Sequence, residues 1–345
     1  MRAGISGLML AMGLATATCA VADDGVYMGD GATVYPITSS QVQLASETVI
    51  ITHGGPDESA PGSRRMSWRV DATLHFRNLG GPTTVQMGFP FGPLGGDIDW
   101  SNPRERDEYD PHFRTWVDGE ETPTTLKQAE PDSGLLRLNR EVVYAFPVDF
   151  AGKQVRTVRH TYRVGGSASS DGSGDFTYVL TTGALWAGRI DTATVRVIVP
   201  VGAAADMDIV CPHEHDARRE GDQLVLEWRW RDLEPDFDLK IASLPRSLHE
   251  MPLDELADET TTQAVWESGT VRRVLRDERP DPCTARWYCN RILAEYGYPF
   301  RSPFVRAQFY AGGACHEDPA FSEAALTPRH RYFLDFLTAK EWPRE

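Results

Sequence analysis

Short stretches in which apolar and polar residues alternate dominate the chain from about residue 34 to residue 242. Examples are "MSWRVDATLHFRN" at residues 66–78, "RTVRHTYRV" at 156–164 and "QLVLEWRWRD" at 223–232. A period of two, with many β-branched and aromatic residues, predicts strands that bury one face. Turn sequences such as Asp118-Gly119 separate these stretches. We therefore expect an antiparallel β-sandwich domain over residues 23–245.

The period becomes helical after Cys283. The stretch "TARWYCNRILAEYG" ends on Gly297, a residue typical of helix C-termini. Ser302 and Pro303 then form an N-cap and first-position pair, which predicts the start of a second helix.

A third helix is predicted after Thr327 and Pro328, which repeat the same capping device. We expect its apolar stripe to consist of Tyr332, Phe333, Phe336 and Leu337. The fold class is thus mainly β, an antiparallel β-sandwich followed by a small three-helix domain at residues 283–345. Residues 246–282, which lack strand alternation, are predicted to be a linker.

The N-terminus has the features of a secretory signal peptide at residues 1–22. One early positive charge, an apolar run and the small residues Ala20-Val21-Ala22 predict cleavage before Asp23. Lipoprotein processing at Cys19 is the alternative, and we rank it second. No later segment approaches the roughly 20 apolar residues of a transmembrane helix. We therefore expect an extracytoplasmic protein, periplasmic or secreted, without a transmembrane segment.

The formal net charge of the chain is −15. An acidic chain repels phosphate backbones and anionic lipid, so the charge argues against nucleic acid as a partner unless a basic patch is locally strong. The acidic, Pro/Gly-rich insertion at residues 92–113 has carboxylate oxygens of the kind that bind calcium. It lacks the fixed spacing of a calcium loop, and a charged surface insertion is the stronger interpretation.

Four cysteines remain after the predicted cleavage, an even count that suggests disulfides in an oxidising compartment. A bridge between Cys289 and Cys315 would leave Cys211 to pair with Cys283. Pairing Cys283 with Cys315 is nearly as well supported, and the sequence does not separate the two arrangements.

The segment "CPHEHD" places His213 and His215 two residues apart, a spacing that puts both imidazoles on one face of a strand and suits zinc. No third potential ligand follows at a sequence spacing typical of a zinc site, and a solvated loop is the stronger interpretation. The chain has no phosphate loop, dinucleotide fingerprint or HExxH helix. No catalytic residue and no cofactor are predicted.

The run "RILAEYGYPFRSP" resembles the YARHG domain, whose defining pattern is Tyr-Ala-Arg-His-Gly-Tyr-x-Phe. The matching residues are Ala294, Gly297, Tyr298 and Phe300, whereas Leu293, Glu295 and Tyr296 replace the Tyr, Arg and His. The resemblance covers residues 283–341 and implies a small extracellular bacterial module without an established activity.

The N-terminal region resembles the secreted bacterial domain of unknown function 4424. The runs that carry this resemblance include "GATVYPITSSQVQLASETVIIT", "WRVDATLHFRN" and "WAGRIDTATVRVIVP". The resemblance implies no known reaction. From the residues and the two resemblances we predict a bacterial cell-envelope protein that binds an envelope protein, a glycan or a peptide. The alternative is an envelope hydrolase, assisted by zinc through His213 and His215.

Overall fold

The computed structural model describes most of the β-rich region and the C-terminal helices. The residues described are 20–22, 25–28, 33–37, 39–56, 66–91, 112–129, 142–165, 167–168, 174–206, 209–211, 215–243, 282–311, 313 and 315–338. Residues 246–281 of the predicted linker and the acidic residues of the insertion at 92–111 lie outside them, whereas Pro282 begins the first C-terminal helix.

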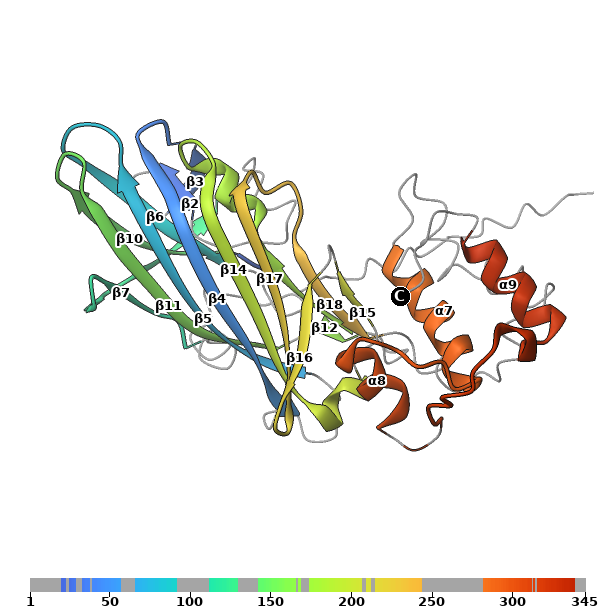
Figure 1. Ribbon diagram of the computed structural model, residues 1–345. Helices are drawn as coiled ribbons and strands as arrows, with labels where there is room; N and C mark the ends of the chain where they lie inside the picture. The colour runs from blue at the N-terminus through green and yellow to red at the C-terminus, as the bar shows by residue number, and fades with distance from the viewer. Residues whose placement is uncertain are drawn as a thin grey trace, which may run out of the picture.

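A large eight-stranded sheet forms one layer of the protein (Figure 1). Its strands, in spatial order, are β16 (Asp216–Glu220), β17 (Gln223–Leu233), β14 (Ile190–Pro200), β4 (Val42–Pro56), β5 (Met66–Asn78), β11 (Val155–Gly165), β7 (Arg114–Val117) and β8 (Glu120–Thr122). All neighbouring strands are antiparallel except β14 and β4, which run parallel.

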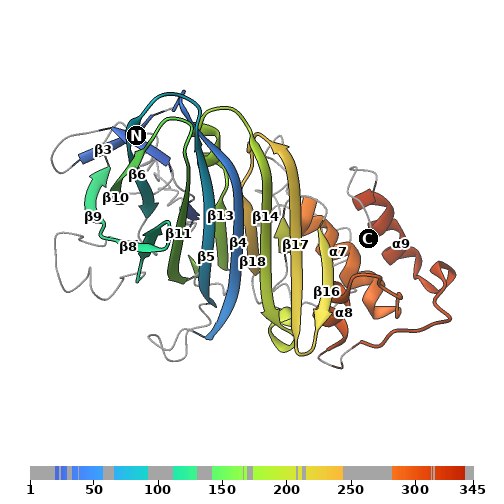
Figure 2. The same cartoon turned by 60° about the vertical axis from the view of Figure 1, so that its left-hand side comes forward.

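The second layer has two parts. One is a closed barrel of β10 (Val142–Phe150), β6 (Thr83–Phe91), β2 (Gly25–Met28), β3 (Thr33–Ile37) and β9 (Thr125–Ala129). The other is a sheet of β1 (Ala20–Ala22), β13 (Gly174–Val179), β18 (Leu239–Ser243) and β15 (Ile209–Cys211), with β12 (Ser167–Ala168) paired to β13. Figure 2 shows β13 and β18 behind the large sheet.

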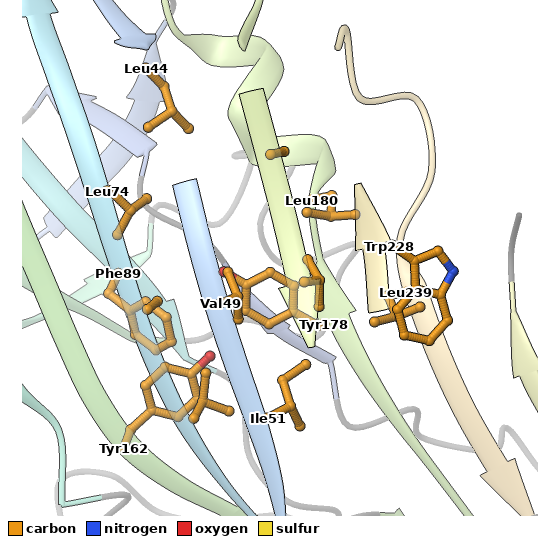
Figure 3. Packing of buried hydrophobic residues seen from close by; sticks show 14 of the residues in the cluster. Leu44, Val49, Ile51, Leu74, Phe89, Tyr162, Tyr178, Leu180, Trp228 and Leu239 are labelled. Atoms are coloured by element: carbon orange, nitrogen blue, oxygen red, sulfur yellow. The ribbon is translucent and has the colours of Figure 1, made fainter. Parts of the chain in front are cut away.

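The main core lies between these layers, as the alternation in the sequence predicts. On β5 the side chains of Trp68, Val70, Ala72, Leu74 and Phe76 are buried. They pack in one cluster with residues of β6, β10, β13 and β18. In Figure 3 the side chains of β4 and β13 occupy the space between the layers. The intervening residues of β5 lie on the outer face of the large sheet, because successive side chains of a strand point to opposite sides.

Three helices follow, as predicted: α7 (Pro282–Glu295), α8 (Pro303–Tyr310) and α9 (Pro328–Thr338). They share a second, smaller core that includes Trp287, Ile292 and Phe300. Phe304 and Ala307 of α8 belong instead to the main core. Helix α8 lies against β16, β17 and the short 3-10 helix η2 (Val201–Asp206). The helical module is therefore docked on the end of the large sheet through α8.

The predicted apolar stripe of α9 is wrong at Tyr332, whose exposed fraction is 57%. The side chains of Phe333, Phe336 and Leu337 lie outside the described part. Among the side chains of this helix that the structure describes, His330 and Leu334 are buried, with exposed fractions of 5% and 0%. They are four residues apart and therefore share a face. A hydrogen bond between His330 and Tyr296 brings this face toward α7, and Tyr332 lies away from it.

Candidate functional site

Of the two histidines proposed as zinc ligands, the structure describes only His215. His213 lies outside the described residues. His215 is half-buried, and its ring lies 4.7 Å from the ring of Trp228. Within the described part of the chain, no group of three or more His, Cys, Asp or Glu side chains is arranged to hold a metal ion.

The predicted disulfide between Cys289 and Cys315 is absent. Cys289 is fully buried on α7, whereas Cys315 Sγ lies 3.7 Å from Glu295 Oε2 at the end of that helix. Six residues of helix separate Cys289 from Glu295, roughly 9 Å at 1.5 Å per residue. A disulfide requires Cα atoms within about 7 Å. The alternative pairing of Cys315 with Cys283 is also absent, because Cys315 is a free cysteine. The side chains of Cys211 and Cys283 are outside the described part.

The residues of the YARHG-like motif contribute to the core and to a turn of the helical module. Ala294 and Phe300 are each 1% exposed, and Tyr298 packs against the small core. Gly297 has φ +77°, and its carbonyl accepts a hydrogen bond from the Asp318 amide at 2.8 Å. A Cβ at Gly297 would lie 2.7 Å from Asp318 Cβ. The motif therefore shapes the helical module.

A depression of about 430 Å³ lies on the outer face of the large sheet, and no sequence motif predicted it. We call it the arginine depression, and it is lined by Ile50, Thr52, Arg69, Val70, Asp71, His112, Thr161, Tyr162 and Arg163. Its floor follows the strand register. One row across β4, β5 and β11 consists of Thr52, Arg69 and Arg163; the next row consists of Ile50, Asp71 and Thr161.

Arg69 and Arg163 lie directly opposite each other on β5 and β11. Both side chains are exposed, and across the described strands and loops neither has an ion-pair or hydrogen-bond partner. Directly opposed residues of an antiparallel pair have Cβ atoms about 4.5–5.5 Å apart, so two like charges there are mutually destabilising. The pair is therefore a local concentration of positive charge on an acidic protein.

His112 stands at the edge of the arginine depression, two residues before β7 begins. Its φ of +52° is uncommon for a residue other than glycine. Sparsely populated backbone conformations of this kind cluster at binding and active sites. The arginine depression therefore has two unusual features, the opposed arginines and the backbone conformation of His112.

The carboxylate beside the two arginines is already engaged. Arg159 donates from Nε to Asp71 Oδ1 at 2.9 Å and from Nη2 to Asp71 Oδ2 at 2.6 Å. These hydrogen bonds to Asp71 are the main reason why the pKa of Arg159 is raised above its ordinary value. Arg159 and Arg114 also lie 5.1 Å and 5.0 Å from the centre of the Trp116 ring, within range for cation–π contact. Of the residues in this network, Asp71 lines the depression, and the two hydrogen bonds from Arg159 hold its carboxylate in place.

Another charged cluster on the same face is internally balanced. Glu227 of β17 accepts from Arg196 at 3.1 Å, from Arg218 at 2.7 Å and from Arg229 at 2.7 Å, and its side chain is fully buried beneath them. Burial disfavours the Glu227 carboxylate, but hydrogen bonds and charges of the arginines outweigh it and lower its pKa. Glu220 and Asp216 take further bonds from Arg218 and Arg229, so the arginines of this cluster have carboxylate partners.

A cleft of about 610 Å³ lies beside the contact between α8 and the end of the large sheet. Its polar residues include Arg219, Arg306, Cys315, His316 and Glu317, and Arg306 is paired with Glu317. Burial raises the pKa of the Cys315 thiol, and the negative charge of Glu295 adds to the effect. The thiol is therefore a weak nucleophile at neutral pH.

Comparison with known proteins supports the architecture. No protein-family model matches the chain, and no curated protein matches it. The resemblances to the YARHG domain and to domain of unknown function 4424 therefore stay predictions. The solved structure of a candidate nutrient-binding protein from Legionella pneumophila is similar, with a TM-score of 0.52 and 17% sequence identity. The similarity covers 94% of this chain and 98% of that one, and it shows the fold alone.

An M1 zinc metallopeptidase from Deinococcus radiodurans is similar over 60% of this chain and 43% of its own, with 14% identity and a TM-score of 0.32. The chain thus spans less than half of that enzyme, and a likeness of this size carries no argument about function. None of the helices in the described ranges combines the length and apolarity that crossing a bilayer requires.

Proposed function

We propose that the chain is an extracytoplasmic binding protein that holds a small anionic ligand in the arginine depression. The observation that carries the proposal is the opposition of Arg69 and Arg163, two arginines without an ion-pair partner among the described residues. Arginine is suited to this task because its planar fork of donors matches carboxylate and phosphate groups. A volume of about 430 Å³ is within the range of small-molecule sites.

Two further points support a binding role. The similar protein from Legionella pneumophila is itself described as a candidate nutrient-binding protein. The signal-peptide pattern at residues 1–22 supports delivery across the cytoplasmic membrane. The competing hydrolase hypothesis requires His215 as a zinc ligand, whereas the ring of His215 lies 4.7 Å from the ring of Trp228.

The test is anion-dependent stabilisation of the purified protein. Chemical denaturation is measured with carboxylates, sulfonates and phosphate esters, and with neutral sugars as controls. A ligand at 100 times its dissociation constant stabilises the native state by about 2.7 kcal/mol. We expect at least one anionic class to stabilise the protein in a saturable manner.

The double variant Arg69→Ala/Arg163→Ala should lose this stabilisation. Arg231→Ala is the matched control, because Arg231 is an exposed arginine of β17 that likewise has no ion-pair partner in the part described. Equal stabilisation of the wild type and the double variant by every anion would overturn the proposal.

A further inference from the structure

The arginine depression is rich in hydrogen-bond donors. Arg69 and Arg163 each carry five N–H groups, and the hydroxyls of Thr52 and Thr161 occupy the adjoining positions of the two rows. Thr52 lies beside Arg69, and Thr161 lies two residues before Arg163 on the same face. Four side chains from three strands therefore present donors to one small area.

Acceptors in the depression are few. Asp71 is the one carboxylate among its described lining residues, and both of its oxygens accept hydrogen bonds from Arg159. This ion pair also neutralises the charge of Asp71. Among the residues that the structure describes, no carboxylate then compensates the positive charges of Arg69 and Arg163 on the floor.

A site with many hydrogen-bond donors, two positive charges and few acceptors favours some anions over others. An amino acid carries an ammonium group beside its carboxylate and would need a carboxylate that is not already engaged. A simple carboxylate or a sulfate ester brings one negative charge to two arginines. A phosphate monoester carries close to two negative charges at neutral pH and three strong acceptor oxygens.

From this match we propose that the arginine depression binds the dianionic phosphoryl group of a phosphate monoester, an inference that rests on the proposed function. Arg69 and Arg163 hold the phosphoryl oxygens, and Thr52 and Thr161 donate from the two sides. Ile50 provides an apolar contact for the group that the phosphate esterifies. The phosphoryl group belongs either to a soluble monoester or to a lipid headgroup, and the chemistry at the arginines is the same.

The experiment compares three aromatic anions of similar size by calorimetric titration at pH 8 and constant ionic strength: phenyl phosphate, phenyl sulfate and benzoate. Phenyl phosphate should bind about tenfold more tightly than either monoanion, since it makes an additional charge-assisted interaction. Arg69→Ala and Arg163→Ala should each weaken phenyl phosphate binding by about tenfold, and Arg231→Ala should not. Arg69→Lys, which keeps the charge and loses the fork, should fall between these values.

The outcomes separate this inference from the function on which it rests. Arginine-dependent binding of benzoate or phenyl sulfate, at least as tight as that of phenyl phosphate, overturns the phosphoryl assignment and leaves the binding function standing. Failure of all three anions to bind in an arginine-dependent manner overturns the phosphoryl assignment, and the wider panel then decides the function. Vesicles of phosphatidylcholine with and without phosphatidic acid identify the source: arginine-dependent binding to the phosphatidic acid vesicles alone assigns the phosphoryl group to a lipid headgroup.

Discussion

The hydroxyl of Tyr296 lies 2.6 Å from Nδ1 of His330 and ties the end of α7 to α9. The same hydroxyl accepts a hydrogen bond from the Thr327 amide at 3.3 Å, while the Thr327 side chain caps α9 through the His330 amide at 3.2 Å. Tyr296 occupies the position of the histidine in the YARHG pattern. Its hydroxyl is thus a structural link between the two helices.

Tyr296→Phe should therefore destabilise the helical module by about 1–2 kcal/mol, because the hydroxyl serves two partners and the ring can remain in place. Hydrogen exchange of the α9 amides measures the effect. Tyr332→Phe is the control, since Tyr332 is exposed and should leave the exchange rates unchanged. Equal protection of α9 in all three proteins would contradict the role given to this hydroxyl.

Gly297→Ala should destabilise the module by about 2 kcal/mol or more. A non-glycine residue in the left-handed region costs about 1–2 kcal/mol, and here the added Cβ would also lie 2.7 Å from Asp318 Cβ and 2.9 Å from the His316 carbonyl oxygen. Gly313→Ala separates the two causes, because Gly313 has φ +73° but no atom of the described residues lies within 4 Å of the added Cβ. Denaturation of both variants tests the prediction, which fails if Gly313→Ala costs as much as Gly297→Ala.

Glu227→Gln should reduce the free energy of unfolding at pH 7 by about 2 kcal/mol, because it removes a buried carboxylate that accepts from three arginines. The folded-state pKa of Glu227 is below its ordinary value of 4.5. Its ionised form therefore contributes stability above pH 4.5, and this contribution is lost as the pH falls through the lower folded-state value.

The stability difference between wild type and Glu227→Gln should accordingly shrink in acid. Urea denaturation between pH 7 and pH 3 measures it. Glu220→Gln is the matched control, because Glu220 is about half exposed and, among the described residues, pairs with one arginine, Arg218, so its effect should be small. A difference that stays constant down to pH 3 would rule out this titration.

Cys315 should react slowly with iodoacetamide at pH 7.5, since burial and the charge of Glu295 raise the pKa of its thiol. Glu295→Gln removes the second cause and should shift the midpoint of the rate against pH downward. Mass spectrometry of the Cys315 peptide follows the reaction at this residue. Glu317→Gln, which alters a neighbouring carboxylate in the same cleft, should leave the midpoint in place. Rapid loss of the Cys315 thiol in wild type at pH 7.5 would contradict the assignment.

The sequence by itself determined the elements and much of their capping. Alternation at residues 66–78 predicts a strand and puts Arg69 and Asp71 on the face opposite Trp68 and Val70, because side chains of a strand alternate. Gly297, Ser302 and Pro303 end one helix and begin the next, as local backbone chemistry requires. The structure has these features where the sequence predicted them.

Only the tertiary structure decided which side chains of the candidate site lie together. Arg69 faces Arg163 because β5 pairs with β11 in one particular register, and a shift of one residue would send these side chains to the opposite face. The same dependence applies to Cys315, whose position beside Glu295 follows from how the segment after α8 packs on α7. Contacts between distant parts of the chain depend on packing and register, whereas periodicity records only which face of its own element each residue occupies.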